Sequence, residues 1–469
     1  MSNLQAERPT VPAVDDLAML DPPELVLRDI ANRRPHTPTG SLPSGSLGWL
    51  IGLSLCATSL SAAPPEISIS GFGTLGGAIS DQDFIYQRYI DDHGTLNRDS
   101  LAGIQLDTRL SDAWSLTLQA KAAPSERDDN AWDPTLTWAF LSWRPTNDLL
   151  WRLGKQRLPL MLYSANSDVG VTFDFARLPT EVYSLLPTTD LTGLSLSKTW
   201  FNGEQEWVLE GYVGRTQTHW RYFLRNRVEP IFSAGTLYLG YELDMAGLVL
   251  SFRDDDNQWR LGLHYDKATW DSGSVPSRFP FVELAPGLGY YQVFEALPGP
   301  GIPNIDSYDI LLVNLGADIA LPHDFRLVGE YGRRRFANST TGPDTSAAYL
   351  AVLKRIGRWT PYIYWSGIRS HETALNFIEA LNDTRVPDSL LYASAINAAQ
   401  RSGADLLSPY DQQSWAIGTS YSLSPTSRIK AEWTHTRTGR LSSFVDSPPD
   451  EDSGGRQINV FSLSYSFTF

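Results

Sequence analysis

Residues 460–469, the last ten of the chain, read VFSLSYSFTF and alternate strictly in character. Large apolar side chains occupy the odd positions from Phe461 to Phe469, and the even positions from Ser462 to Thr468 carry nothing larger than threonine. A period of two indicates a β-strand whose two faces meet different surroundings. In a soluble sandwich the apolar face would pack on a second sheet. In an outer-membrane barrel it would meet lipid, and the polar face would meet a water-filled lumen.

The composition is compatible with a membrane barrel and narrows the classes of function. Charged residues make up 19% of the chain, below the ~25% usual for soluble domains, and aromatic residues make up 12%. The mean hydropathy is still −0.23, which suits strands that are half exposed to water, in a barrel or in a large soluble β-protein. A net charge of −15 disfavours nucleic acid as a partner. The single cysteine, Cys56, excludes a disulfide framework.

The chain divides into a leader region and a long β-rich region. Residues 1–46 are rich in Pro, Asp and Ser without a sustained period, which predicts a disordered extension or a start site assigned too early. Residues 47–63 combine an apolar core with a small-residue cleavage site near Ala63, as in a signal peptide for export; a short buried helix is the alternative. No stretch reaches the ~20 apolar residues of a membrane-spanning helix. Residues 64–469 are predicted to form the barrel.

The connections between candidate strands fall into two classes. The short ones are 111–112, 145–148, 202–205, 254–257, 321–324, 356–358 and 424–427, and the long ones run about 81–99, 124–133, 158–190, 269–304, 337–345, 371–411 and 439–456. Short periplasmic turns alternating with long extracellular loops are typical of an outer-membrane barrel. We therefore predict an all-β, antiparallel transmembrane β-barrel of about sixteen strands, or eighteen if 215–254 holds three strands rather than one. A barrel of this width leaves an aqueous lumen.

Two stretches resemble those of known outer-membrane proteins. Phe469, with Tyr465 and Phe467 before it, resembles the ending that these proteins present to the barrel-assembly machinery. The second stretch, 154–187, carries an Arg-x-Pro-Leu turn, a Tyr-Ser, an Asp-Val-Gly and a Pro-x-Glu-Val-Tyr. These motifs fall on Arg157, Pro159, Leu160, Tyr163, Ser164, Asp168, Val169, Gly170, Pro179, Glu181, Val182 and Tyr183. This stretch resembles a segment of Gram-negative outer-membrane porins, general or phosphate-selective, which implies that about 158–190 folds into the barrel as a constriction loop.

Alternation and this resemblance together give a set of pore-lining and constriction residues. In LLWRLGKQR (149–157), Trp151 and Leu153 face lipid, so Arg152 and Gln156 face the lumen. The full set is Arg109, Lys121, Arg152, Gln156, Arg157, Asp168, Asp174, Arg177, Glu181, Arg326, Glu330 and Arg334. Arginines facing carboxylates create a transverse field that tunes which ions pass, and we expect a weak anion preference. The alternative is that these charges only hydrate the lumen.

These features predict a passive porin for small hydrophilic solutes in the outer membrane of a Gram-negative bacterium. The expected partners are lipid, lipopolysaccharide, the assembly machinery and two further copies of the chain in a homotrimer. The chain has no phosphate loop, no His-Glu-x-x-His and no Gly-x-Ser-x-Gly motif, so we expect no catalytic residue, metal or cofactor. His371-Glu372 begins like a zinc-helix motif but lacks the second histidine. An outer-membrane barrel enzyme of the lipase or protease type and a secreted soluble β-rich binding protein remain the alternatives.

Overall fold

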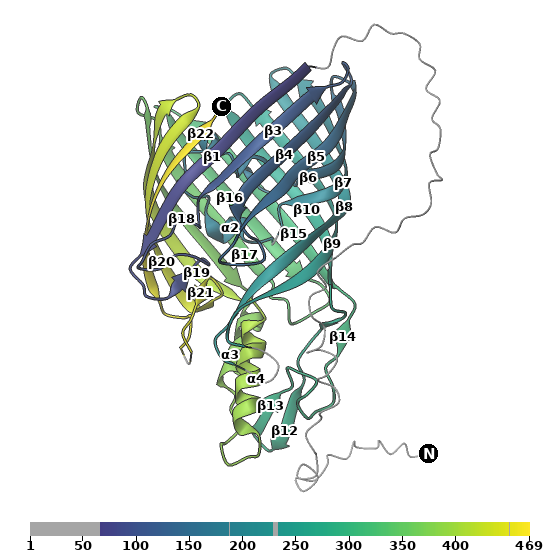
Figure 1. The fold of residues 1–469 in the computed structure, drawn as a ribbon, viewed down its shortest axis with the longest axis vertical. Coiled ribbons are helices and arrows are strands. Elements are labelled where there is room, and N and C mark those ends of the chain that lie inside the picture. Colours follow the sequence, from purple (N-terminus) through teal and green to yellow (C-terminus); the bar gives the residue numbers. More distant parts are fainter. Residues whose placement is uncertain (1–65, 187, 228–232, 450) are drawn as a thin grey trace, which may run out of the picture. The chain divides into compact units, whose positions relative to one another are not determined.

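The computed structural model describes residues 66–186, 188–227, 233–449 and 451–469. Within them, sixteen strands pair antiparallel in chain order, and the first strand pairs with the last to close a barrel (Figure 1). The predicted extension 1–46 and signal peptide 47–63 lie outside the described residues. The barrel strands are β1 (Glu66–Ser80), β3 (Leu101–Arg109), β4 (Trp114–Pro124), β5 (Trp132–Thr146), β6 (Leu149–Arg157), β7 (Asp190–Asn202), β8 (Gln205–Leu224), β9 (Gly235–Asp254), β10 (Asn257–Trp270), β15 (Tyr308–Leu321), β16 (Phe325–Phe336), β17 (Thr345–Lys354), β18 (Trp359–Ser370), β19 (Tyr410–Ser424), β20 (Ser427–Ser442) and β22 (Gln457–Thr468).

The two faces of β22 are as unlike in the structure as in the sequence. Leu463 is 61% exposed on the outer wall, whereas Ser464 is 4% exposed and points inward. Aromatic rings gather on the outer wall close to the short turns, where Trp207 and Phe252 lie 4.4 Å apart between ring centroids and Phe252 and Trp259 lie 5.1 Å apart. Such a belt is typical of the boundary between lipid and water. No helix among the described residues is long and apolar enough to span a bilayer.

The uncertain stretch 215–254 holds the second half of β8 and the whole of β9, so the count is sixteen rather than eighteen. β8 and β9 pair along their whole length, from Glu206 opposite Arg253 to Leu224 opposite Gly235. The second half of β8 carries polar residues on both faces, which hides the alternation in the sequence. Backbone pairing with β9 holds this half of the strand in place regardless of its polarity.

The long loops at the other end of the barrel contain structure of their own, which we call the outer subdomain (residues 271–307 and 371–409). It holds β11 (Val275–Pro276), β12 (Phe281–Ala285), β13 (Leu288–Tyr291), β14 (Asn304–Ile305), α3 (Glu372–Asp383) and α4 (Ala393–Asp405) (Figure 1). Leu375 and Ile378 of α3 pack with Ala399 and Ala404 of α4 in a small hydrophobic core. The sequence predicts only a long loop over 371–411, whereas the structure has two helices there. His371 instead caps α3, since its ring nitrogen Nδ1 accepts a hydrogen bond from the Thr373 backbone at 3.3 Å.

Candidate functional site

The predicted constriction loop does enter the barrel. Residues 158–189, called the inner loop below, leave β6 and return to β7, and they contain the short helices η2 (Ser164–Asn166), η3 (Gly170–Thr172) and α2 (Thr180–Tyr183). The helix α2 contacts β16, β17 and β18, and η3 contacts β20 and β22. Phe175 is fully buried against the rings of Tyr349, Tyr362 and Tyr364. Because β6 and β18 lie eight places apart in the ring of sixteen strands, the inner loop crosses the lumen to reach the opposite wall.

This packing explains why β22 carries only small side chains on its inner face. Gly170 of the inner loop lies directly against Ser466 and Thr74, and a Cβ atom added to it would meet Ser466 Oγ at 2.3 Å. Ser466 and Thr74 bond to each other at 2.9 Å across the seam between β22 and β1. A larger side chain at position 466 would displace the loop. The small side chains on the inner face of the last strand thus leave room for the backbone of the inner loop.

Two buried glutamates anchor the inner loop to the wall. Glu181 of α2 accepts hydrogen bonds from Ser366 at 2.9 Å and from Gln412 at 2.9 Å. Glu330 instead belongs to the wall, on β16, and binds the loop. It accepts hydrogen bonds from the Tyr183 hydroxyl at 2.6 Å and the Leu162 backbone at 2.6 Å. Both carboxylates are buried by the loop, so they hold it in place rather than facing a passage.

Three basic residues also anchor the inner loop, one within the loop and two on strands of the barrel wall. Arg177 of the loop makes two bonds to Asp99, at 2.7 and 2.5 Å. Burial alone would raise the pKa of Asp99, but the charge and hydrogen bonds of Arg177 outweigh this effect and lower it. Lys430 and Arg334 donate to loop carbonyls, Lys430 to Phe175 at 2.9 Å and Arg334 to Leu185 at 2.9 Å.

A further charge cluster holds the start of the loop. Asp168 lies between Lys121, at 3.2 Å from both carboxylate oxygens, and Arg157, with which it forms an ion pair. Burial would raise the pKa of Asp168, but the charges of Lys121 and Arg157 lower it instead. Asp174 pairs with Arg428 at 2.5 Å. These positive and negative charges neutralise one another inside the lumen.

The remaining predicted residues lie apart from the loop anchors. Arg326 bonds to Asp318 on its own wall at 3.0 Å, and Arg109 pairs with Asp112 beside a short turn. Arg152 and Gln156 lie on β6, in the part of the wall from β3 to β8 along which cavities remain, called the uncovered side below. Most residues of the predicted set thus either belong to the inner loop or bind it, and their part in solute passage stays a prediction.

Two cavities mark the uncovered side. One, of about 550 Å³, is lined by the inner faces of β3, β4, β5 and β6, including Asp107, Trp138, Phe140, Arg144 and Arg152. A smaller one, of about 70 Å³, lies between β6, β7, β8 and the inner loop. Arg152 lines both cavities. Both cavities lie along the wall from β3 to β8, and this arginine is on the boundary between them.

The long-loop end of the barrel is bridged by ion pairs that the sequence reading did not foresee. Arg221 of β8 binds Asp446, at 2.9 Å through Nη1, and Asp129, at 3.0 and 3.1 Å through Nε. Asp446 belongs to β21 (Val445–Asp446), in the loop between β20 and β22. In the closed ring of sixteen strands, β8 and β20 lie eight places apart, so this ion pair joins opposite walls. We call it the mouth bridge.

A second bridge ties the outer subdomain to the end of β8. Arg225 bonds to Asp405 of α4 at 2.8 Å, to Asn382 at 2.7 Å and to Asp452 at 2.8 Å. A polar cavity of about 260 Å³ adjoins these residues. We call this contact the subdomain bridge. Together the two bridges draw loops from several strands over the entrance to the lumen.

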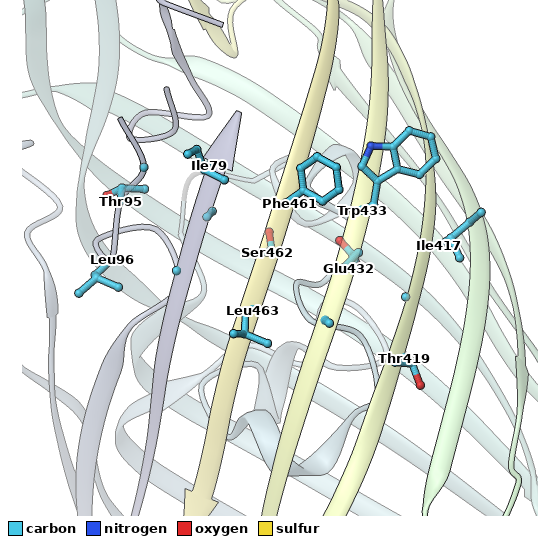
Figure 2. A pocket seen from close by; sticks show the side chains of 15 residues that line it. Ile79, Thr95, Leu96, Ile417, Thr419, Glu432, Trp433, Phe461, Ser462 and Leu463 are labelled. Carbon is cyan, nitrogen blue, oxygen red and sulfur yellow. The ribbon is translucent and has the colours of Figure 1, made fainter. Parts of the chain in front are cut away.

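The outer wall carries a groove of about 870 Å³ across β1, β22, β20 and β19. Figure 2 shows Ile79, Leu463, Phe461 and Trp433 along it, with Leu96 at one edge, on the loop after β1. Its lining is mostly apolar, with small residues such as Gly77 at its base. The loop after β1 also holds β2 (Ile85–Tyr86), which pairs with β21 from the loop between β20 and β22.

Replacing Glu330 by alanine is expected to weaken the attachment of the inner loop and lower the heat stability of the barrel. The hydroxyls of Tyr183 and Tyr349 and the Leu162 backbone would each lose their acceptor, at about 1–3 kcal/mol for each buried donor. The measurement is the temperature at which the purified barrel loses its compact, fast-migrating form on gels. Glu206→Ala, at an exposed ion pair with Arg253, is the control. Equal temperatures for both variants would contradict an anchoring role.

No protein-family model and no curated protein matches this chain. Among solved structures it is similar to OprB of Pseudomonas putida, at 12% identity over 86% of this chain and 94% of that one, with a TM-score of 0.48. It is also similar to an anion-selective porin from Comamonas acidovorans, at 9% identity over 87% and 100%, TM-score 0.46. A third is OmpT, an outer membrane protein of Vibrio cholerae in a trimer form, at 11% identity over 87% and 100%, TM-score 0.45. The chain is thus a closed, sixteen-stranded antiparallel barrel that is similar in architecture to outer-membrane porins.

Proposed function

We propose that the chain is an outer-membrane porin that lets small hydrophilic solutes diffuse through a passage along one side of its lumen. One observation carries this proposal: the inner loop packs on the wall from β16 to β22, and the cavities lie along β3 to β8. An apolar outer wall around a partly open lumen suits a channel. The two bridges at the entrance make that end the narrower access.

A passive role is favoured over the enzyme alternative by the inner wall itself. His264 of β10 is the buried histidine of the lumen wall, and its ring is held between the Tyr212 hydroxyl at 2.6 Å and the Asn314 side chain at 2.8 Å. A catalytic base needs a nucleophile within hydrogen-bond reach, and these partners do not supply a serine or cysteine. Asn314 also donates to the Leu160 carbonyl at 2.5 Å, which suits a role in holding the inner loop.

An anion preference is supported by the charges on the uncovered side. Among the described residues, Arg144 and Arg152 have no ion-pair partner within 4 Å, whereas the lumenal carboxylates Asp168 and Asp174 are paired with Lys121, Arg157 and Arg428. Unpaired guanidinium groups beside a passage attract anions. Reversal potentials measured under a salt gradient test this, and a clear cation preference would reject it.

The expected partners follow from the outer surface. We propose that a second copy of the chain covers the groove over β1, β22, β20 and β19 in a homotrimer. Of the basic run after Tyr331, Arg333 and Arg335 are exposed, and Arg334 is buried, so lipopolysaccharide phosphates would meet Arg333 and Arg335. Tyr465, Phe467 and Phe469 form an aromatic row on the outer wall, where the assembly machinery could bind them.

Planar-bilayer recording of the purified protein tests the channel directly. We expect the native protein to conduct in discrete steps. Boiling should unfold the barrel, so that both its fast gel mobility and its conductance are lost. The unheated oligomer should have three times the mass of the chain. A protein that stays monomeric and soluble without detergent, or that hydrolyses lipid or peptide but never conducts, would overturn the proposal.

A further inference from the structure

A continuous row of side chains crosses β5 and β6 on the uncovered side of the lumen. Trp138 and Phe140 lie with ring centroids 5.9 Å apart, and the guanidinium of Arg152 lies 5.3 Å from the Phe140 ring centroid. Gly154 pairs with Phe140 across the strands. A Cβ at this glycine would meet the Ala139 carbonyl oxygen at 2.2 Å, so no side chain can cover the row from that position.

Three polar side chains in and beside this row have buried hydrogen-bonding groups without a partner in the part of the chain that the structure describes, and all of these groups are donors. Arg152 Nε, Trp138 Nε1 and Gln156 Nε2 are buried and have no partner among the described residues. Gln156 is 5% exposed, and its side-chain oxygen accepts from Ser195 at 2.6 Å, which leaves the NH₂ group free. Buried donors without acceptors are strongly unfavourable. An acceptor from outside the chain would satisfy them.

The charges around the row favour an anionic acceptor. Arg144 and Arg152 line the 550 Å³ cavity together, and neither forms an ion pair with a described residue. Asp107, in the same cavity, already accepts hydrogen bonds from Thr117 and Gln105. Two carboxylates nearby have no ion pair with a described residue. Glu66 of β1 lines the larger cavity, and Glu210 of β8 lines the smaller cavity with Arg152 but lies beyond ion-pair distance from it.

We propose that Trp138 and Arg152 form a subsite in the larger cavity for the carboxylate group of a permeating solute, with Arg144 contributing charge and Gln156 offering a further donor beside Arg152 in the smaller cavity. This inference rests on the proposed channel function and names the chemistry that the passage recognises. The carboxylate oxygens accept from the Arg152 guanidinium and the Trp138 indole, and the body of the solute lies on the Phe140 ring. Glu210 distinguishes two classes of solute that contain a carboxylate, because it repels a simple carboxylic acid and attracts the ammonium group of an amino acid.

Three solutes with the same aromatic body test the subsite: 3-phenylpropanoate, phenylalanine and 2-phenylethylamine. We expect the acid and the amino acid to block single-channel current and the amine not to. Arg152→Gln should weaken the block roughly tenfold or more, and Trp138→Phe, which keeps the ring but removes the N–H, roughly fivefold. Arg215→Gln removes the same charge at an exposed ion pair with Asp244 and should leave the block unchanged.

The variant Glu210→Gln distinguishes the two classes of solute, since it should strengthen the block by the simple acid and weaken the block by the amino acid. Block of equal strength in native protein and the Arg152 and Trp138 variants, or equal block by the amine, would overturn the subsite while leaving the channel intact. Calorimetric titration of the detergent-purified protein with the same three solutes provides a second readout. A protein that binds the carboxylates in a manner dependent on Arg152 but never conducts would refute the channel and keep the subsite.

Discussion

Replacing Arg221 by alanine is expected to raise the single-channel conductance several-fold. The Arg221 side chain binds Asp446 and Asp129 from two different loops, and Asp446 joins it from the opposite wall of the barrel. In the variant, the Asp446 carboxylate, whose side chain is 3% exposed, would be left buried without a counter-charge. Breaking a buried pair in this way destabilises the bridged state by about 3–5 kcal/mol. The loops over the entrance should then part, and larger solutes should pass.

The control for this experiment is Arg215→Ala on the same strand. Arg215 is exposed and pairs with Asp244 and Glu242, and ion pairs at a solvent-exposed surface contribute little to stability. The measurement is the step size in planar bilayers at neutral pH, supported by the rate at which neutral sugars of increasing size swell liposomes. Unchanged steps and an unchanged size limit in Arg221→Ala would show that the mouth bridge does not restrict the passage.

The fold was readable from the sequence because its signal is local. A barrel strand repeats every two residues, so Leu463 and Ser464 show their faces without reference to any other part of the chain. The short turns are equally local. The outer subdomain was missed although α3 carries a helical signal, since Leu375, Ile378 and Leu381 recur every three residues on its buried face. The packing partners of α3 and α4 lie in another loop, near Phe279 and Val293, so their assembly cannot be deduced from either helix alone.

The candidate site was predictable in location but not in role. Alternation places Glu330 and Arg334 in the lumen, and the structure has both there, but their partners are the Tyr183 hydroxyl and the Leu185 carbonyl of the inner loop. Which lumenal charges face solute depends on where that loop lies, and this is a property of the closed barrel. The bridge between Arg221 and Asp446 depends in the same way on the order of the strands, since it joins residues far apart in the chain.

Lowering the pH from 7 to 5 is expected to hold the entrance more tightly closed and to reduce conductance. Burial raises the pKa of Asp405 to about 6, although the charge and hydrogen bonds of Arg225 oppose this effect. Burial likewise raises the pKa of Asp446. Released into water, each carboxyl would return to about 3.9. The bridged state therefore binds protons more tightly than the released state, and protonation favours it.

The effect of Asp405 begins as the pH falls through about 6 and is complete below about 4. Two pKa units correspond to about 3 kcal/mol in favour of the bridged state. Asp129 does not interfere in this window: burial would raise its pKa, but hydrogen bonds from Arg221, Tyr238 and Arg88 lower it to about 2, so it stays ionised. Asp405→Asn should show low conductance already at pH 7 and a smaller pH response, whereas Glu206→Gln at the far rim should behave like the native protein. A conductance that rises on acidification, and no longer does so in Asp405→Asn, would contradict this prediction. It would mean that the attraction between charged Asp405 and Arg225 stabilises the closed entrance by more than the burial of the Asp405 charge destabilises it.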